Sequence, residues 1–189
     1  MTNEKTSKST RRAPNVLITG VPGTGKTTLA EALSEALGAS VARVDVNALA
    51  RAREFFLEYD DEMDTHVLDE DALLDEMESE LAKTIDGGCV VDYHSCELFP
   101  ERWFDLVVCL TCASDTATLY ERLEKRGYGE RKIRENVECD IFQVVVEEAK
   151  DSYENVWVRE NKTLEEMEAT TREVAAWFNA RVEERKKQG

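Results

Sequence analysis

The chain of 189 residues is 42% hydrophobic and 34% charged, a composition that suits one domain with a substantial core. No apolar run is long enough for a membrane span, so none is expected. The first 13 residues hold four bases and one acid, which leaves 20 bases against 39 acids, a net charge of −19, in the rest. That balance disfavours direct, sequence-specific nucleic-acid binding by the body of the protein.

The stretch MTNEKTSKSTRRA (1–13) is rich in Ser, Thr, Lys and Arg and lacks the apolar region of a secretory signal. It is predicted to be a disordered basic tail, with a transit peptide or a basic localisation patch as the alternative. Residues 14–189 are predicted to form the single folded domain. Cys109 and Cys112 have CxxC spacing without a second pair, so the five cysteines are predicted to be reduced thiols and not zinc ligands.

Short apolar runs alternate with amphipathic segments along the chain, a pattern typical of a parallel sheet with crossover helices. The runs that we expect to form buried strands are 15–20, 40–46, 89–92, 106–110 and 156–158. The segments that we expect to form helices follow at about 29–37, at about 74–85, at 113–127, at about 136–152 and from a capping box at Thr163–Glu166. The prediction is a three-layer α/β fold with about five parallel strands.

The segment GVPGTGKTT (20–28) follows the first strand and matches the phosphate-binding loop G-x-x-x-x-G-K-[ST] in full. Its glycines let successive backbone N–H groups point at phosphates, while Lys26 reaches the β- and γ-phosphates and Thr27 offers a hydroxyl to Mg²⁺. The motif predicts a P-loop NTPase fold that binds ATP with Mg²⁺. The predicted contacts of the nucleotide are Gly23, Thr24, Gly25, Lys26, Thr27 and Thr28.

The order of the remaining parts resembles adenylate kinases, in which two arms close over the nucleotides. The insert at about 45–68 occupies the place of the monophosphate-binding arm, where Arg51 would grip the acceptor phosphate of AMP. The alternative is an arginine of a surface helix in solvent. A short lid at about 125–135 would bring Arg126 to the transferring phosphoryl group. Arg122, Arg131 and Arg134 are weaker candidates.

A narrower resemblance rests on LITGVPGTGKTTLAEAL, LDED, VVDYHSCELFPERWFD, LYERLEKRGY and EN…IFQVVVEEA. Together these segments resemble the adenylate kinase isoenzyme 6 family, nuclear kinase-like ATPases linked to small ribosomal subunit maturation. The resemblance runs from about residue 14 to 155 and weakens toward the C-terminus. The chain departs from the family in VARVDVNALAR, which is longer, and in LTCASDT, which replaces a shorter link containing an arginine. These departures concern the acceptor contacts more than ATP binding.

The resemblance implies a broad-specificity nucleoside monophosphate kinase that converts ATP and AMP to two ADP with Mg²⁺ and that also hydrolyses ATP. It implies a basic small-subunit ribosomal protein as partner, a role in 18S rRNA maturation, and a location in the nucleus and cytoplasm. We expect a monomer. The alternatives are an ATP-switched assembly factor with vestigial kinase activity and a P-loop kinase for a small metabolite.

The stretch VVDYHS (90–95) sets an acid and an imidazole at a strand end. By the resemblance, Asp92 would hold the water shell of the metal, since phosphate-loop folds place an acid there. The alternative is a plain strand-terminating acid. Residues 92 and 94 of an extended chain point to the same side, so His94 would accept a proton from water or orient it. The alternative for His94 is a packed structural histidine.

Overall fold

The computed structural model describes residues 11–39, 41–60, 65–84, 86 and 88–188. The elements in chain order are β1 (Asn15–Thr19), α1 (Lys26–Leu37), β2 (Ala42–Asp45), α2 (Val46–Arg53), β3 (Phe56–Asp60), β4 (Thr65–Leu68), α3 (Glu70–Ala82), β5 (Cys89–Asp92), η1 (Glu101–Trp103), β6 (Leu106–Thr111), α4 (Thr116–Lys125), α5 (Glu130–Ile141), α6 (Val144–Ser152), β7 (Val156–Glu160) and α7 (Leu164–Gln188). Among the described helices, none combines the length and the apolar character needed to cross a membrane.

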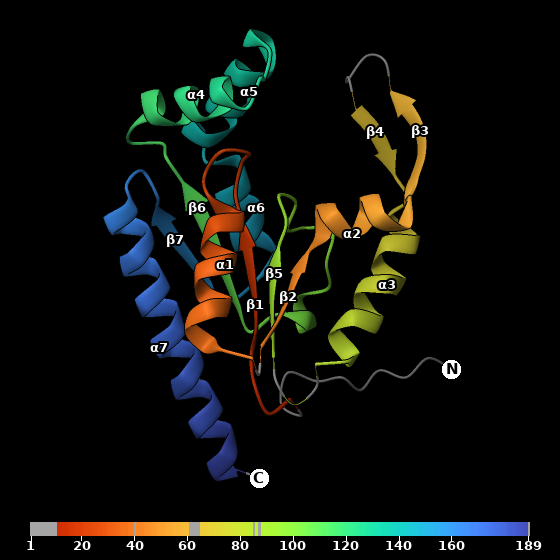
Figure 1. The fold of residues 1–189 in the computed structure, drawn as a ribbon, viewed down its shortest axis with the longest axis vertical. Coiled ribbons are helices and arrows are strands. Elements are labelled where there is room, and N and C mark those ends of the chain that lie inside the picture. The colour runs from red at the N-terminus through yellow and green to blue at the C-terminus, as the bar shows by residue number, and fades with distance from the viewer. Residues whose placement is uncertain (1–10, 40, 61–64, 85, 87, 189) are drawn as a thin grey trace.

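The core of the molecule is a five-stranded sheet in the order β2-β5-β1-β6-β7 (Figure 1). All four strand pairs are parallel, which confirms the predicted α/β fold with about five parallel strands. The strands β1, β5 and β6 are buried along their whole length, as their continuous apolar runs indicate. The carboxyl ends of all five strands therefore meet at one edge of the sheet.

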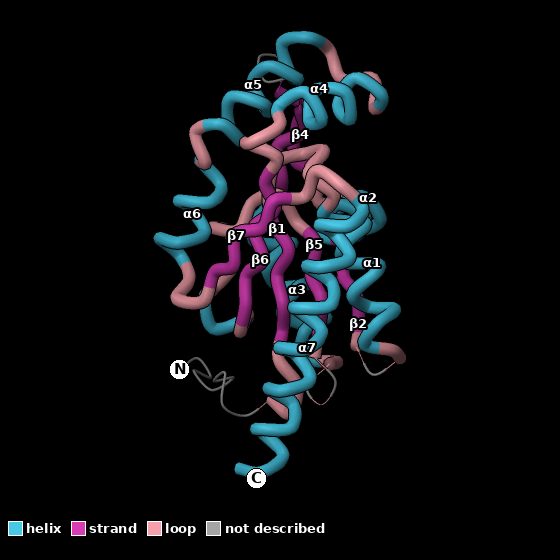
Figure 2. The backbone as a smooth tube through the Cα atoms, turned by 90° about the vertical axis from the view of Figure 1, so that its left-hand side faces the viewer, coloured by secondary structure: helices cyan, strands magenta, loops and turns pink. Residues whose placement is uncertain are grey.

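Helices cover both faces of the sheet and make it the middle of three layers (Figure 2). Helices α1 and α7 pack on one face, where Leu33 and Phe178 join Ile18 and Val90 in one buried cluster. The other face is covered by α3, α6 and the short η1 helix, whose buried side chains form a second cluster. That second cluster includes Leu73, Met77, Phe99, Trp103, Phe104 and Tyr153.

The segment predicted to be the monophosphate-binding arm, 45–68, contains α2 and an antiparallel hairpin of β3 and β4. Figure 1 shows this hairpin projecting beyond the carboxyl edge of the sheet, on the side opposite α4 and α5. These two strands are not among those that we expected from the sequence. Phe56 pairs with Leu68 in the hairpin, and this pair faces a pocket described below.

The prediction of one helix at about 136–152 is wrong, because the structure has two helices there. Helix α5 already begins at Glu130 and ends at Ile141. Gln143 then has φ of 56°, a left-handed conformation that does not occur inside a right-handed α-helix. The Gln143 side chain holds this corner by donating to the Thr111 hydroxyl at 3.1 Å and to the Asp140 carbonyl at 2.8 Å. The corner thus fixes α5 and α6 to the end of β6.

Asp105, which lies just before β6, joins both ends of the described chain. Its carboxylate accepts hydrogen bonds from Arg11, from the Asn15 backbone and from Arg185 near the end of α7. Of the predicted tail, residues 1–10 lie outside the described residues, whereas Arg11 and Ala13 are buried. The N-terminal segment is therefore attached to the domain from Arg11 onward.

The structure has all five cysteines as free thiols. Burial raises the pKa of Cys109 to about 12 and that of Cys112 to about 11. Within the described residues, no three His, Cys, Asp or Glu side chains are grouped to hold a metal ion. The CxxC pair is part of the packed interior at the end of β6.

Candidate active site

The phosphate loop connects β1 to α1 at the carboxyl edge of the sheet. Gly20, Gly23 and Gly25 have φ of 137°, 91° and 95°, values that residues other than glycine rarely adopt. A Cβ atom at Gly20 would also collide with the carbonyl of Leu110, and one at Gly25 would collide with the amide of Asn161. The loop is therefore wrapped as its sequence predicts, with the N-terminus of α1 at its centre.

Lys26 is the first residue of α1, and only 9% of its surface is exposed. Its ammonium group donates to the carbonyl of Val21 at 3.1 Å, across the loop. Burial lowers the pKa of Lys26 to about 8, with Arg126 acting in the same direction and Asp92 opposing it. A triphosphate bound in the loop would raise the pKa of Lys26 again, because it supplies anionic oxygens.

Asp92 ends β5 beside Lys26, and 2% of its surface is exposed. Its Oδ2 atom is buried without a hydrogen-bond partner among the described residues. Burial raises the pKa of Asp92, while a hydrogen bond with the Thr27 hydroxyl and the charge of Lys26 lower it. A hydroxyl next to an unpartnered carboxylate oxygen is the kind of hard oxygen set that Mg²⁺ prefers. Thr27 and Asp92 therefore fit Mg²⁺.

A pocket of about 450 Å³ lies against the phosphate loop on the side of α4 and α7. Gly23, Gly25 and Thr28 line it together with Arg126, so the structure brings these predicted nucleotide residues together. The hydroxyl of Thr24 points elsewhere, donating to the Val21 carbonyl at 2.9 Å. Thr24 would therefore contact a nucleotide through its backbone and not through its hydroxyl.

Arg122 has a different role from Arg126, although both belong to the end of α4. Its guanidinium group donates to the carbonyls of Gly23 at 3.3 Å, Asn161 at 2.8 Å and Lys162 at 2.7 Å. Arg122 therefore ties the phosphate loop to the loop after β7. Arg131 and Arg134 are exposed on α5 and pair with neighbouring glutamates, away from the pocket.

A second pocket, of about 420 Å³, lies between the arm and the end of β5. Arg51 of α2 and His94 both line it, so the structure brings together two predicted site residues from distant parts of the chain. The other lining residues are Asn47, Ala50, Phe56, Leu68 and Tyr93. One cation and two aromatic rings suit an anionic ligand that carries a flat ring.

His94 is exposed, which does not fit the alternative of a packed structural histidine. Its ring lies 4.4 Å from the ring of Tyr93, centroid to centroid, and its backbone carbonyl accepts from the Thr19 hydroxyl at 3.3 Å. Partial desolvation and then the charge of Lys26 lower the pKa of His94. The imidazole is therefore neutral at pH 7 and able to accept a proton.

Asn161, which follows β7, is a site residue that sequence reasoning missed. It is buried, and its Nδ2 atom donates to the carbonyl of Thr24 at 2.6 Å. The signal was its position at the carboxyl end of the last strand, two residues before the predicted capping box. That box is confirmed, because the Glu166 N–H donates to the Thr163 hydroxyl at 3.2 Å and the Glu166 carboxylate accepts from the Thr163 N–H at 3.2 Å.

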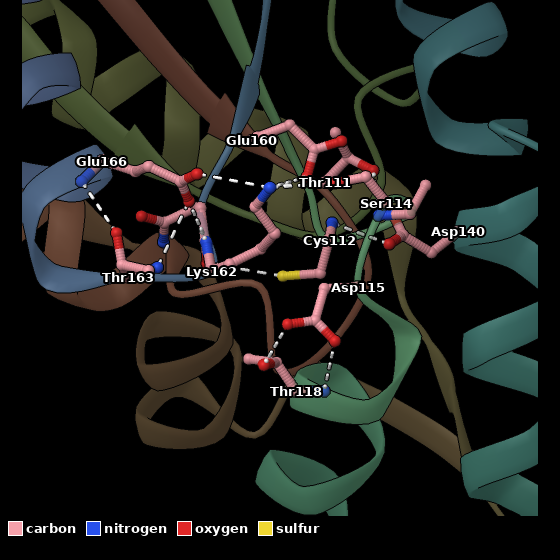
Figure 3. Close-up of polar contacts among 12 residues, drawn as sticks. Thr111, Cys112, Ser114, Asp115, Thr118, Asp140, Glu160, Lys162, Thr163 and Glu166 are labelled. Atoms are coloured by element: carbon pink, nitrogen blue, oxygen red, sulfur yellow. Dashed lines mark hydrogen bonds and ion pairs between the residues drawn. The ribbon is translucent and has the colours of Figure 1, made fainter.

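Figure 3 shows the polar contacts that hold the loops after β6 and β7. The backbone N–H of Cys112 donates to buried Asp140 of α5 at 2.8 Å, and Lys162 donates to the Ser114 hydroxyl at 2.9 Å. Asp115 caps α4 through the Thr118 N–H and hydroxyl. The segment LTCASDT therefore forms the base of the lid and makes no contribution to the pocket of Arg51.

The fold and the phosphate loop define a P-loop protein with the fold of small kinases. The chain can be superposed on shikimate kinase from Bacteroides thetaiotaomicron with a TM-score of 0.60 and 14% identity, covering 88% of this chain and 98% of the other. A gluconokinase from Sinorhizobium meliloti gives a TM-score of 0.55 and 17% identity, covering 95% of this chain and 99% of the other. Residues 16–143 match a family described as an AAA domain.

Sequence relatives define the family more narrowly. The adenylate kinase isoenzyme 6 homolog of Caenorhabditis elegans is 50% identical over 161 residues, which cover 84% of this chain and 86% of the relative. The homolog of Drosophila melanogaster is 41% identical over 167 residues, covering 87% of this chain and 91% of the relative. The chain belongs to the adenylate kinase isoenzyme 6 family.

Proposed function

We propose that this protein transfers a phosphoryl group from ATP to AMP, giving two ADP, and that it also hydrolyses ATP. The observation that supports this most directly is the presence of two pockets, one against the phosphate loop and one between the arm and the end of β5. One contains Arg126 and the loop glycines, and the other contains Arg51 and two aromatic walls. A donor and an acceptor nucleotide in these pockets would place their phosphates at Lys26.

In this reaction the residues of the chain supply position and charge. Lys26 and Arg126 would stabilise the negative charge that develops on the transferring group, and Arg51 would hold the phosphate of AMP. Mg²⁺, held through Thr27 and by Asp92 through water, supplies charge neutralisation of the phosphates when it is bound. His94 lies on the acceptor side, where it would orient a water molecule when AMP is absent.

The test is to incubate the purified protein with MgATP, with and without AMP, and to measure ADP. Formation of ADP that depends on AMP supports the kinase, and formation of ADP from ATP alone supports the hydrolase. If the protein shows neither activity, the proposal is refuted. Transfer to shikimate or gluconate in place of AMP would favour the alternative of a small-metabolite kinase.

We also propose that a basic small-subunit ribosomal protein binds this protein during small-subunit maturation, in the nucleus and cytoplasm. The resemblance to the family and the net charge of −19 outside the first 13 residues support this. ATP binding and hydrolysis would then switch the affinity for the partner, with the kinase reaction secondary. A pull-down with the purified ribosomal protein, with and without ATP, tests this second function.

A further inference from the structure

A second carboxylate, Asp45 at the end of β2, lies beside the candidate metal site. Strands β2 and β5 are parallel neighbours, and Asp45 is the register partner of Asp92. Neighbouring strands are about 4.8 Å apart, and register partners of a parallel pair project from the same face. Asp45 and Asp92 therefore start from adjacent positions at the carboxyl edge of the sheet.

The face to which Asp45 belongs is the face of α1. Arg43, two residues earlier on β2, points to that face, because it pairs with Glu31 of α1 at 3.2 Å. Val44, between them, packs in the cluster on the opposite face. Asp45 therefore lies on the side of the sheet from which Lys26 and Thr27 begin α1.

Two electrostatic effects agree with this placement. The raised pKa of Asp92 is caused first by burial, and the negative charge of Asp45 raises it further. The pKa of Lys26 is lowered first by burial, and Asp45 is among the charges that oppose this. The field of Asp45 thus reaches both functional side chains of the phosphate site.

Asp45 is also the N-cap of α2, the helix that carries Arg51. Its Oδ1 atom accepts a hydrogen bond from the Ala48 N–H at 2.9 Å. A carboxylate has two oxygens, each able to accept more than one hydrogen bond. Capping therefore leaves Asp45 with acceptor capacity for water.

From this geometry we propose that Asp45 is a positioning residue for the metal of MgATP: together with Asp92 it accepts hydrogen bonds from metal-bound water. The inference rests on the proposed function, since it assigns a further residue to the same metal site. Magnesium retains several waters in protein sites, so outer oxygen acceptors contribute to its retention. The carboxylate of Asp45 would accept these hydrogen bonds from the side of the site that faces the proposed AMP pocket.

The test uses Asp45→Asn, because Asn caps a helix about as well as Asp and only the charge is lost. The matched control is Asp69→Asn. Asp69 caps α3 in the same way, through the Ala72 N–H at 3.1 Å, and its loss changes the net charge equally. The dissociation constant of ATP is measured by calorimetry for each protein, with excess Mg²⁺ and with excess EDTA.

We expect Asp45→Asn to weaken MgATP binding about three- to ten-fold while leaving metal-free ATP binding unchanged or tighter, because a repulsive charge near the phosphates is removed. The control should keep the wild-type ratio of the two constants. A wild-type ratio in Asp45→Asn, or a parallel loss of both affinities, would overturn the inference. If Asp45→Asn does not fold, Asp45→Ser, which also caps, replaces it. A wild-type protein that does not respond to Mg²⁺ would instead refute the metal site of the proposed function.

Discussion

The amide of Asn161 donates to the carbonyl of Thr24 at 2.6 Å, and this bond joins the end of the sheet to the phosphate loop. Both groups are buried, so removal of the amide would leave the Thr24 carbonyl without its partner. Arg122 reinforces the same connection through the carbonyls of Gly23 and Asn161. The shape of the phosphate loop therefore depends on the loop after β7.

The first prediction concerns this bond. We expect Asn161→Ala to weaken ATP binding about five- to ten-fold, as the loss of one buried hydrogen bond would. Asn155→Ala is the control, because Asn155 makes a similar bond to the Asp105 carbonyl at 2.8 Å, at the other end of β7. The control should lower the melting temperature and leave ATP affinity unchanged. Equal ATP affinities in both variants would contradict the prediction.

The second prediction separates two arginines of α4. Arg126→Ala should lower turnover about 100- to 1,000-fold with a much smaller effect on ATP affinity, because a lid cation acts on charge that develops during transfer. Arg122→Ala should lower both the melting temperature and ATP affinity, since Arg122 donates to three backbone carbonyls. Steady-state kinetics, calorimetry and thermal melting measure these effects. A change in ATP affinity alone in Arg126→Ala would make Arg126 a binding residue.

The third prediction concerns Lys26 and pH. Lys26→Met should abolish turnover, because the variant lacks the cation that faces the phosphates. The folded-state pKa of Lys26, about 8, lies below its ordinary value of 10.5, so the unfolded chain binds more protons between these values. The Lys26 contribution to stability therefore rises with pH from about 8 to 10.5, and it is unfavourable at pH 7. We expect the nucleotide-free variant to melt no lower than wild type at pH 7. A clearly lower melting temperature would show that Lys26 stabilises the fold.

The fourth prediction concerns His94, which is exposed beside Tyr93 in the pocket of Arg51. His94→Ala should lower ATP hydrolysis about 100-fold and AMP phosphorylation much less, because only hydrolysis needs a positioned water. In wild type, hydrolysis should fall on the acid side as the imidazole gains a proton, at a pH below the ordinary pKa of 6.5. Equal loss of both activities together with a lower melting temperature would instead assign His94 to the fold.

The fifth prediction concerns the acidic surface. Binding of a purified basic small-subunit ribosomal protein should weaken at least about fivefold between roughly 0.05 and 0.2 M salt, because exposed charges are screened beyond a Debye length of about 8 Å at physiological ionic strength. Fluorescence titration at several salt concentrations measures this. Salt-insensitive binding, or none, would leave the acidity as a contribution to solubility alone.

The sequence predicts best those features that depend on local backbone requirements. The three glycines of the phosphate loop occupy conformations that only glycine adopts readily, and the buried strands are short β-branched runs. The imidazole of VVDYHS lines the pocket of Arg51, whereas the acid, Asp92, does not. This could not be read from their spacing, because β5 stops at Asp92 and the chain bends at His94.

Features that depend on distant contacts were harder to predict. Asn161 acquires its role only because β7 ends opposite the phosphate loop. Arg122 and Arg126 are alike in sequence, and only the three carbonyls around Arg122 distinguish them. The left-handed corner at Gln143 has no Gly or Pro to mark it, and it is held by a hydrogen bond to Thr111. The hairpin of β3 and β4 does have a local signal, the alternation of apolar and acidic residues in LEYD (57–60).

The junction at Asp105 has a mechanical consequence. Arg11 and Arg185, near the two ends of the chain, bond to the same carboxylate at the edge of the sheet opposite the phosphate loop. A stretching force applied through the two ends would therefore act first on these ion pairs, before it reaches the strands. In an optical-trap experiment, rupture at Asp105 should come first, release α7 from its C-terminal end, and leave the nucleotide pockets intact until the sheet itself yields.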